Sequence, residues 1–289
     1  MAGSGFGTNF RITTWGETHG AGVGVVVDGC PAGLPLERED VQKYLDRRKP
    51  GQSKYTTQRK EGDQVEILSG IFEGRTTGTP ISMVVYNKDQ RSKDYSNIKD
   101  IYRPGHADFT FDMKYGFRDY RGGGRSSGRE TIGRVAAGAV AAKVLKELGI
   151  EIKAYAKAIA GIEVSKDHFD FAEMNNNPFN MPDKEAAKLV QEKADQMIKE
   201  MDSIGGIIEC QITGMPVGIG ETVFDKLDAE LSKAIMSIGS VKGFEIGDGF
   251  EAANLRGSEN NDDFICVDGK VEKETNHSGG VLGGMSDGS

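Results

Sequence analysis

The chain has 289 residues, 44 acidic against 36 basic side chains, and a formal net charge of -8. With 37% hydrophobic and 28% charged residues it has the composition of a globular protein with its own core, which excludes a disordered chain. The acidic balance argues against nucleic-acid binding, which needs a broad basic face. No apolar run is long enough to span a bilayer, and the N-terminus lacks the pattern of a secretory signal, so we expect no membrane partner.

The cysteines indicate a reducing compartment. Cys30, Cys210 and Cys266 are widely spaced and form no C-x-x-C pair. Such a set favours neither a disulfide framework nor a zinc site. We therefore expect a cytoplasmic protein with no metal centre.

Two stretches, residues 23–51 and 207–240, share one order of elements. Each begins with an apolar strand, passes through a Gly-x-Pro-x-Gly turn (29–33 and 214–218) and continues as an amphipathic helix. The first helix is predicted to end near Arg48, and the second to carry Phe224, Leu227, Leu231 and Ile235. Coincidence in so short a pattern is the alternative, but the order and spacing favour an internal strand–turn–helix pseudo-repeat.

Between and after these stretches the sequence predicts further strands and two long helices. Residues 63–74 and 78–87 are predicted to form strands. Residues 126–149 predict a helix, with Ser127 and Glu130 at capping-box spacing and Gly149 at its end. Residues 181–206 predict a second helix, which carries Ala186, Val190, Ala194 and Ile198 on one face.

Helices and strands mix without strict alternation. This order favours an α+β fold over a doubly wound parallel sheet. We expect one layered domain over residues 1–289, a sheet–helix–sheet sandwich. In the first repeat a glycine turn at 74–78 leads into the strand at 81–86, whereas the glycine run 279–284 of the second is followed by no such strand. We therefore expect the chain to be C-terminally truncated.

The stretch Gly116–Arg134 concentrates positive charge in an acidic chain. It holds five arginines and two acids, Asp119 and Glu130, around the glycines 122–124. A helix N-terminus directly follows, and its N–H groups and dipole favour anions. Arg125, Ser126 and Ser127 therefore indicate an anion site. The alternative is a solvated basic loop in which Ser127 serves only as a helix cap.

A second basic cluster lies at residues 47–60 and includes Arg48 and Lys54. Taken alone, such a run is typical of a solvated surface or a subunit contact. Beside the first cluster it indicates a ligand with more than one anionic group.

Two of the four histidines, His19 and His106, lie in loops bounded by glycines. A histidine placed there can approach a ligand and transfer protons near neutral pH. For either histidine taken alone, an ordinary loop histidine is the better interpretation. We expect no such role for His168 or His277.

The combination of segments resembles the chorismate synthase family. The matching stretches are residues 10–20, 46–81, 94–140, 235–250 and 275–284. The resemblance implies a lyase of the shikimate pathway, which supplies aromatic amino acid biosynthesis. It would remove phosphate from 5-enolpyruvylshikimate 3-phosphate by 1,4-elimination, using reduced FMN and no net redox change. It also implies a homotetramer and a flavin reduced by NADPH or by an external reductase.

The resemblance also implies roles for individual residues. His19 would protonate the departing phosphate, and His106 would stabilise and protonate the reduced flavin. Many members carry Asn-Ala where this chain has Gly239-Ser240. The flavin-binding set would be Arg125, Ser126, Ser127, Gly239, Ser240 and Gly283, and Arg48, Lys54 and Arg134 would contact substrate or NADPH.

Family members continue beyond the glycine run with flavin-contacting and acidic catalytic segments. We therefore expect the 289-residue polypeptide to bind FMN weakly and to be poorly active. Two other functions remain open: a module that only binds a phosphorylated ligand, and a different flavin-dependent lyase or oxidoreductase.

Overall fold

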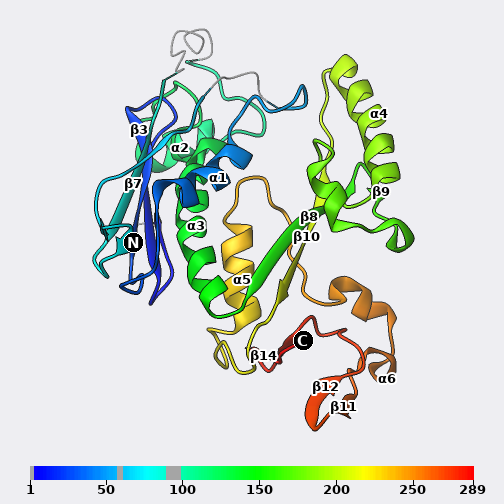
Figure 1. Cartoon of the computed structure of the whole chain (residues 1–289). Coiled ribbons are helices and arrows are strands. Elements are labelled where there is room, and N and C mark those ends of the chain that lie inside the picture. The colour runs from blue at the N-terminus through cyan, green and yellow to red at the C-terminus, as the bar shows by residue number, and fades with distance from the viewer. Residues whose placement is uncertain (1–2, 57–60, 89–98) are drawn as a thin grey trace. The chain divides into compact units, whose positions relative to one another are not determined.

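The computed structural model describes residues 3–56, 61–88 and 99–289. The chain divides into two compact units (Figure 1). Unit 1 contains Met1–Lys49, Glu61–Gly149 and Gly214–Ser289, and unit 2 contains Pro50–Lys60 and Ile150–Thr213. No helix in the described ranges is long and apolar enough to cross a membrane.

Unit 1 is built on a five-stranded antiparallel sheet. Its central strand β3 (Gly22–Asp28) buries Val23, Val25 and Val27, because both of its edges are paired and one face is covered. The strand order is β1 (Gly5–Phe6), β2 (Arg11–Gly16), β3, β7 (Ile81–Tyr86) and β4 (Val65–Ile67).

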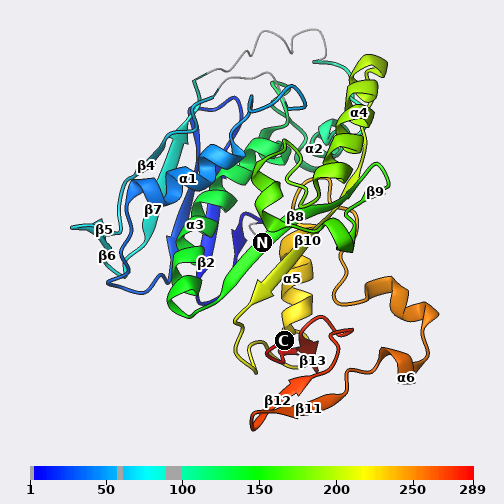
Figure 2. The same ribbon diagram turned by 45° about the vertical axis from the view of Figure 1, so that its right-hand side comes forward.

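Two helices, α1 (Arg38–Arg48) and α3 (Thr131–Glu147), cover this sheet (Figure 2). α1 buries Val41 and Leu45, and it ends where the sequence predicted. α3 approaches the sheet closely at Gly133, where a Cβ atom would lie 2.9 Å from the Thr14 methyl group and 3.2 Å from the Gly24 carbonyl. The absence of a side chain there lets the helix lie directly on β2 and β3.

The pseudo-repeat is visible in the hydrogen bonds of unit 1. The hairpin β5–β6 (Ile71–Phe72, Arg75–Thr76) is hydrogen-bonded to the first Gly-x-Pro-x-Gly turn. The hairpin β13–β14 (Val281–Leu282, Met285–Ser286) is hydrogen-bonded to the second. Thr76 Oγ1 donates to the carbonyl of Pro31, and Ser286 Oγ donates to that of Pro216. The amide of the first turn's last glycine donates to the Thr76 carbonyl at 2.8 Å, and its counterpart donates to the Ser286 carbonyl at 2.7 Å. The two turns therefore share sequence, hairpin and hydrogen-bond pattern.

The remaining elements of unit 1 bury few of their side chains. It contains α2 (Asp108–Tyr115), α5 (Leu227–Met236), the short α6 (Gly257–Asn260) and the hairpin β11–β12 (Phe264–Val267, Lys270–Lys273). None of the ten residues of α5 is buried. The prediction that Phe224 lies on this helix is wrong, because the residue precedes the first turn of α5. Its side chain is 87% exposed.

Unit 2 pairs one sheet with one helix. The antiparallel sheet has the order β10 (Gly206–Thr213), β8 (Glu151–Ile159), β9 (Ile162–Glu163). α4 (Lys184–Glu200) begins after Asp183, whose carboxylate accepts from the amides of Glu185 and Ala186. Of the residues predicted to share one face of α4, Ala186, Val190 and Ala194 are buried, whereas Ile198 near the end of the helix is 50% exposed.

The fold is α+β, as the sequence predicted, and every strand pair in the described residues is antiparallel. The second repeat's strand β10 belongs to unit 2, whereas its helix and hairpin belong to unit 1. The single layered domain over residues 1–289 stays a prediction.

Candidate active site

The Gly-rich basic stretch forms two short 3-10 turns, Gly124–Ser126 and Gly128–Glu130, before α3 begins. The Ser127 side chain caps the second turn by accepting from the Arg129 amide. The predicted capping box is nevertheless wrong. The Glu130 carboxylate accepts instead from Thr14 Oγ1 and from Arg134 Nε, each at 2.9 Å, so it ties α3 to the sheet.

Arg125 joins this stretch to the end of β2. Its guanidinium donates to the Gly16 carbonyl at 3.0 Å and to Thr14 Oγ1 at 2.6 Å. Gly16 is followed directly by the loop that carries His19, and His19 is 8% exposed. The structure therefore brings the His19 loop and the Gly-rich stretch together through one side chain. Ser126 Oγ donates within its own turn, to the Gly123 carbonyl at 2.6 Å.

Electrostatics give a second link between these segments. The pKa of Asp119 is lowered, first by hydrogen bonds from Arg121 and to a smaller extent by the charge of His19. Because Coulomb interactions fade with distance, this coupling indicates that His19 lies near the start of the Gly-rich stretch.

His106 lies on a turn that Asp108 stabilises. The buried Asp108 carboxylate accepts from Arg103 Nε at 2.8 Å and lies 3.2 Å from Arg118 NH1. The hydrogen bonds from Arg103 hold the pKa of Asp108 at about 2. Arg103 NH2 also donates to the Gly122 carbonyl at 3.3 Å, so the His106 turn is tied to the glycine loop.

Arg48 belongs to a buried ionic network at the start of α3. Its NH1 group lies 2.6 Å from Asp63 Oδ2, and Arg129 NH1 lies 2.9 Å from Asp63 Oδ1. Arg48 Nε also donates to Thr131 Oγ1 at 3.1 Å. The side chains of Asp63 and Arg129 are 0% and 5% exposed, so the ion pair between them is shielded from water.

Arg134 connects α3 to the segment after α5. It donates to Ser237 Oγ at 2.7 Å and to the Ser237 carbonyl at 3.1 Å. Gly239 and Ser240 follow two and three residues later. Ser240 adopts a φ of +71°, a left-handed conformation that is unusual for a residue other than glycine.

All five arginines of Gly116–Arg134 lie against carboxylates. Arg118 pairs with Asp108 and Asp112, Arg121 with Asp119, Arg125 and Arg134 with Glu130, and Arg129 with Asp63 and Glu61. The acids at 61, 63, 108 and 112 come from outside the stretch. The concentration of positive charge seen in sequence is therefore largely balanced by the fold.

Two further predicted site residues, Lys54 and Gly283, are described by their own surroundings. Lys54 belongs to unit 2, where its Nζ lies 2.6 Å from Asp195 Oδ1 and 5.1 Å from the centre of the Tyr55 ring. Gly283 lies in the turn of the β13–β14 hairpin with a φ of +62°. Arg59 and Lys60, which the sequence placed in the second basic cluster, lie outside the described residues.

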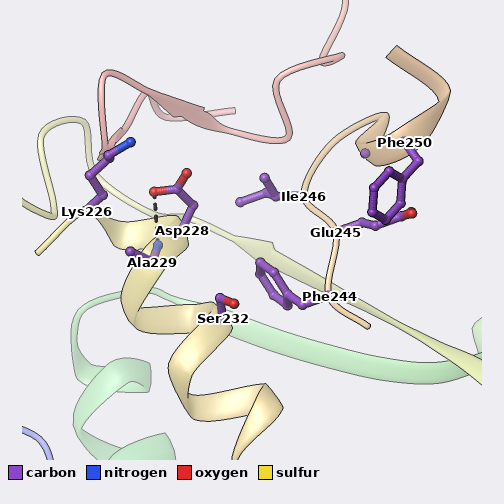
Figure 3. Close-up of a pocket in the computed structure, with 9 residues that line it drawn as sticks. Lys226, Asp228, Ala229, Ser232, Phe244, Glu245, Ile246 and Phe250 are labelled. Atoms are coloured by element: carbon purple, nitrogen blue, oxygen red, sulfur yellow. Dashed lines mark hydrogen bonds between the residues drawn. The ribbon is translucent and has the colours of Figure 1, made fainter. Parts of the chain in front are cut away.

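A cavity of about 450 Å³ opens beside α5 (Figure 3). Asp228 and Ser232 of the helix line it together with the loop from Phe244 to Phe250. Its lining, as far as the structure describes it, includes none of the predicted site residues.

Sequence reasoning missed Asn87 and Asp63. Asn87 follows β7 and bonds to both the His19 loop and Arg129. Asp63 precedes β4. Neither carries a local signal of this role, because the partners of each are distant in sequence.

Comparison with known proteins agrees with this geometry. The family model of chorismate synthase matches residues 10–289. The chain is 70% identical over 288 residues to a chorismate synthase of Lachnospira eligens and 65% identical over 289 residues to one of Agathobacter rectalis. Each alignment covers 100% of this chain and 79% of the relative. A crystal structure of a chorismate synthase superposes with a TM-score of 0.81 at 32% identity, covering 97% of this chain and 82% of the other. This chain belongs to the chorismate synthase family of lyases.

Proposed function

We propose that this chain removes phosphate from 5-enolpyruvylshikimate 3-phosphate to form chorismate. The 1,4-elimination breaks one C–O bond to phosphate and one C–H bond, and it forms a new double bond without net oxidation. The observation that carries the proposal is the Arg125 guanidinium, which joins the His19 loop to the Gly-rich stretch in a chain that is 70% identical to a chorismate synthase.

His19 is the proposed acid for the departing phosphate. Its loop is closed by the Gly20 amide, which donates to the Glu17 carbonyl at 3.1 Å. Its low exposure supports this role, because a shielded proton donor passes its proton to the bound leaving group rather than to bulk water.

His106 is the proposed second proton carrier. Its Nδ1 atom lies 2.9 Å from the Pro104 carbonyl, which can only accept a hydrogen bond. Nδ1 is therefore the donor of this hydrogen bond, which leaves Nε2 as the ring nitrogen that can exchange a proton with a ligand. The exposed ring on a glycine turn can then take up and return a proton at Nε2.

The residues present fit a phosphate-bearing flavin. A Cβ added at Gly124, Gly128 or Gly239 would meet no atom within 4 Å, so a ligand could approach the backbone there. The NH2 group of the buried Arg129 lies 3.7 Å from a Glu61 carboxylate oxygen but has no hydrogen-bond partner among the described residues. We propose that Arg125, Ser126, Ser127, Gly239, Ser240 and Gly283 hold reduced FMN.

When bound, the flavin would lend an electron to the allylic system and recover it. Arg48, Lys54 and Arg134 are proposed to contact the substrate, or NADPH where that serves as reductant. Because Asp63 holds Arg48 and Glu130 holds Arg134, these guanidinium groups are oriented in advance of binding. We further propose a cytoplasmic homotetramer supplied with reduced flavin by NADPH or a separate reductase.

An oxygen-free assay with reduced FMN and the phosphorylated substrate tests the proposal. We expect chorismate and phosphate in equal amounts with no net consumption of reductant, and a loss of activity of at least a hundredfold in His19→Ala and His106→Ala. Consumption of reductant in proportion to product would instead identify an oxidoreductase. Ligand binding without turnover, unaffected by either substitution, would identify a binding module.

A further inference from the structure

Asn87 donates three hydrogen bonds to backbone carbonyls of the loop that carries His19. It follows β7 directly, and its backbone amide donates to the Ala21 carbonyl at 3.0 Å. Its Nδ2 group donates to the Glu17 carbonyl at 2.9 Å and to the Gly20 carbonyl at 2.8 Å. These two carbonyls flank His19 in the chain, so one side-chain amide holds the loop on both sides of the histidine.

The other end of the same amide faces Arg129. Asn87 Oδ1 accepts from Arg129 Nε at 2.6 Å, while Arg129 NH1 bonds to Asp63 at 2.9 Å. Asp63 in turn bonds to Arg48 at 2.6 Å. Through Asn87, the His19 loop is therefore connected by hydrogen bonds to the buried ionic network of Arg129, Asp63 and Arg48.

The chemistry of this position requires an amide. A carboxylate in place of Asn87 could still accept from Arg129, but it could not donate to the two loop carbonyls. An aliphatic side chain could do neither. Only a group with two N–H donors and one acceptor in a single plane makes all three side-chain bonds.

We propose that Asn87 is the positioning residue for His19: it holds the loop from Glu17 to Gly20 and couples it to the Arg48–Asp63–Arg129 network. This inference rests on the proposed function of His19 as an acid. It predicts that loss of the two donated hydrogen bonds lowers the rate of the chemical step and leaves substrate binding nearly intact.

The informative variant is Asn87→Asp, which keeps the bond to Arg129 and removes the two donors. We expect kcat to fall about tenfold to hundredfold, because a small displacement of a catalytic group has effects of that size. KM should change less than about threefold, and amide hydrogen exchange should accelerate in the peptide covering residues 15–22.

A matched control is Asn177→Asp in unit 2. Asn177 also donates to two backbone carbonyls, those of Glu173 and Met181, each at 2.8 Å. This control should lose local protection near residue 177 and retain both kcat and the exchange rate of residues 15–22. If Asn87→Asp does not fold, Asn87→Ser, which is too short to reach both carbonyls, should show the same effects.

Unchanged kcat or unchanged exchange at residues 15–22 in the Asn87 variant would overturn the proposal. So would an equal fall of kcat in both variants, since that would indicate a general loss of stability. If the parent chain releases no phosphate, the proposed function fails, and the exchange measurement alone decides whether Asn87 holds the loop.

Discussion

Replacing Asp63 by asparagine tests the buried ionic network at the start of α3. The Asp63 side chain is 0% exposed and bonds to two guanidinium groups, at 2.6 Å and 2.9 Å. Its φ is +42°, in the left-handed region that asparagine tolerates. The substitution therefore changes the charge and leaves backbone and shape nearly unchanged.

The expected effect is large because two cations lose their shared counter-ion. Arg129 is 5% exposed and Arg48 20% exposed, so water can replace little of the lost interaction. Breaking a buried ion pair on one side costs about 3–5 kcal/mol. We expect Asp63→Asn to lower the free energy of unfolding of unit 1 by about 3 kcal/mol, a shift of roughly 1 M in the urea midpoint.

Trp15 provides the assay, because it is the one tryptophan in the sequence and lies in β2 of unit 1. Its fluorescence during urea unfolding reports on unit 1. The control is Asp28→Asn, which removes the Arg11–Asp28 bridge at 2.9 Å, where the side chains are 60% and 45% exposed. That loss should stay below about 1 kcal/mol. Equal destabilisation by the two substitutions would refute the reasoning.

Two further predictions concern stability. The hydrogen bonds from Arg103 lower the pKa of Asp108 to about 2 in the folded state. The resulting stabilisation of about 2 kcal/mol is present above roughly pH 4 and is lost as the pH falls towards 2. The free energies of unfolding of wild type and Asp108→Asn, measured as a function of pH, should therefore converge at low pH. Parallel curves would contradict this prediction. Gly29 and Gly33 both have φ near +84°, but a Cβ lies 1.8 Å from the Asn9 carbonyl only at Gly29. Gly33→Ala should therefore cost about 1 kcal/mol and Gly29→Ala clearly more, and equal Tm losses would count against the clash.

Local sequence predicted several of the principal helices and strands. Alternation of apolar residues predicted β3, helical periodicity predicted α1 and α4, and end signals such as Gly149 predicted α3. The pseudo-repeat was also readable, because its glycines adopt positive φ in both copies and few other residues can replace them there. These features depend on residues a few positions apart, so the sequence alone indicates them.

The roles of charged side chains were decided only by the tertiary structure. In sequence, Gly116–Arg134 is a basic stretch beside two acids, whereas in the fold its arginines meet acids from other segments, such as Asp63 and Asp108. Similarly, Glu130 does not form the expected capping box, and its carboxylate accepts a hydrogen bond from Thr14, which is 116 positions away. A charged group pairs with whatever the fold places within a few ångströms. Spacing along the chain therefore could not reveal which arginines bind carboxylates, or that Asn87 holds the loop around His19.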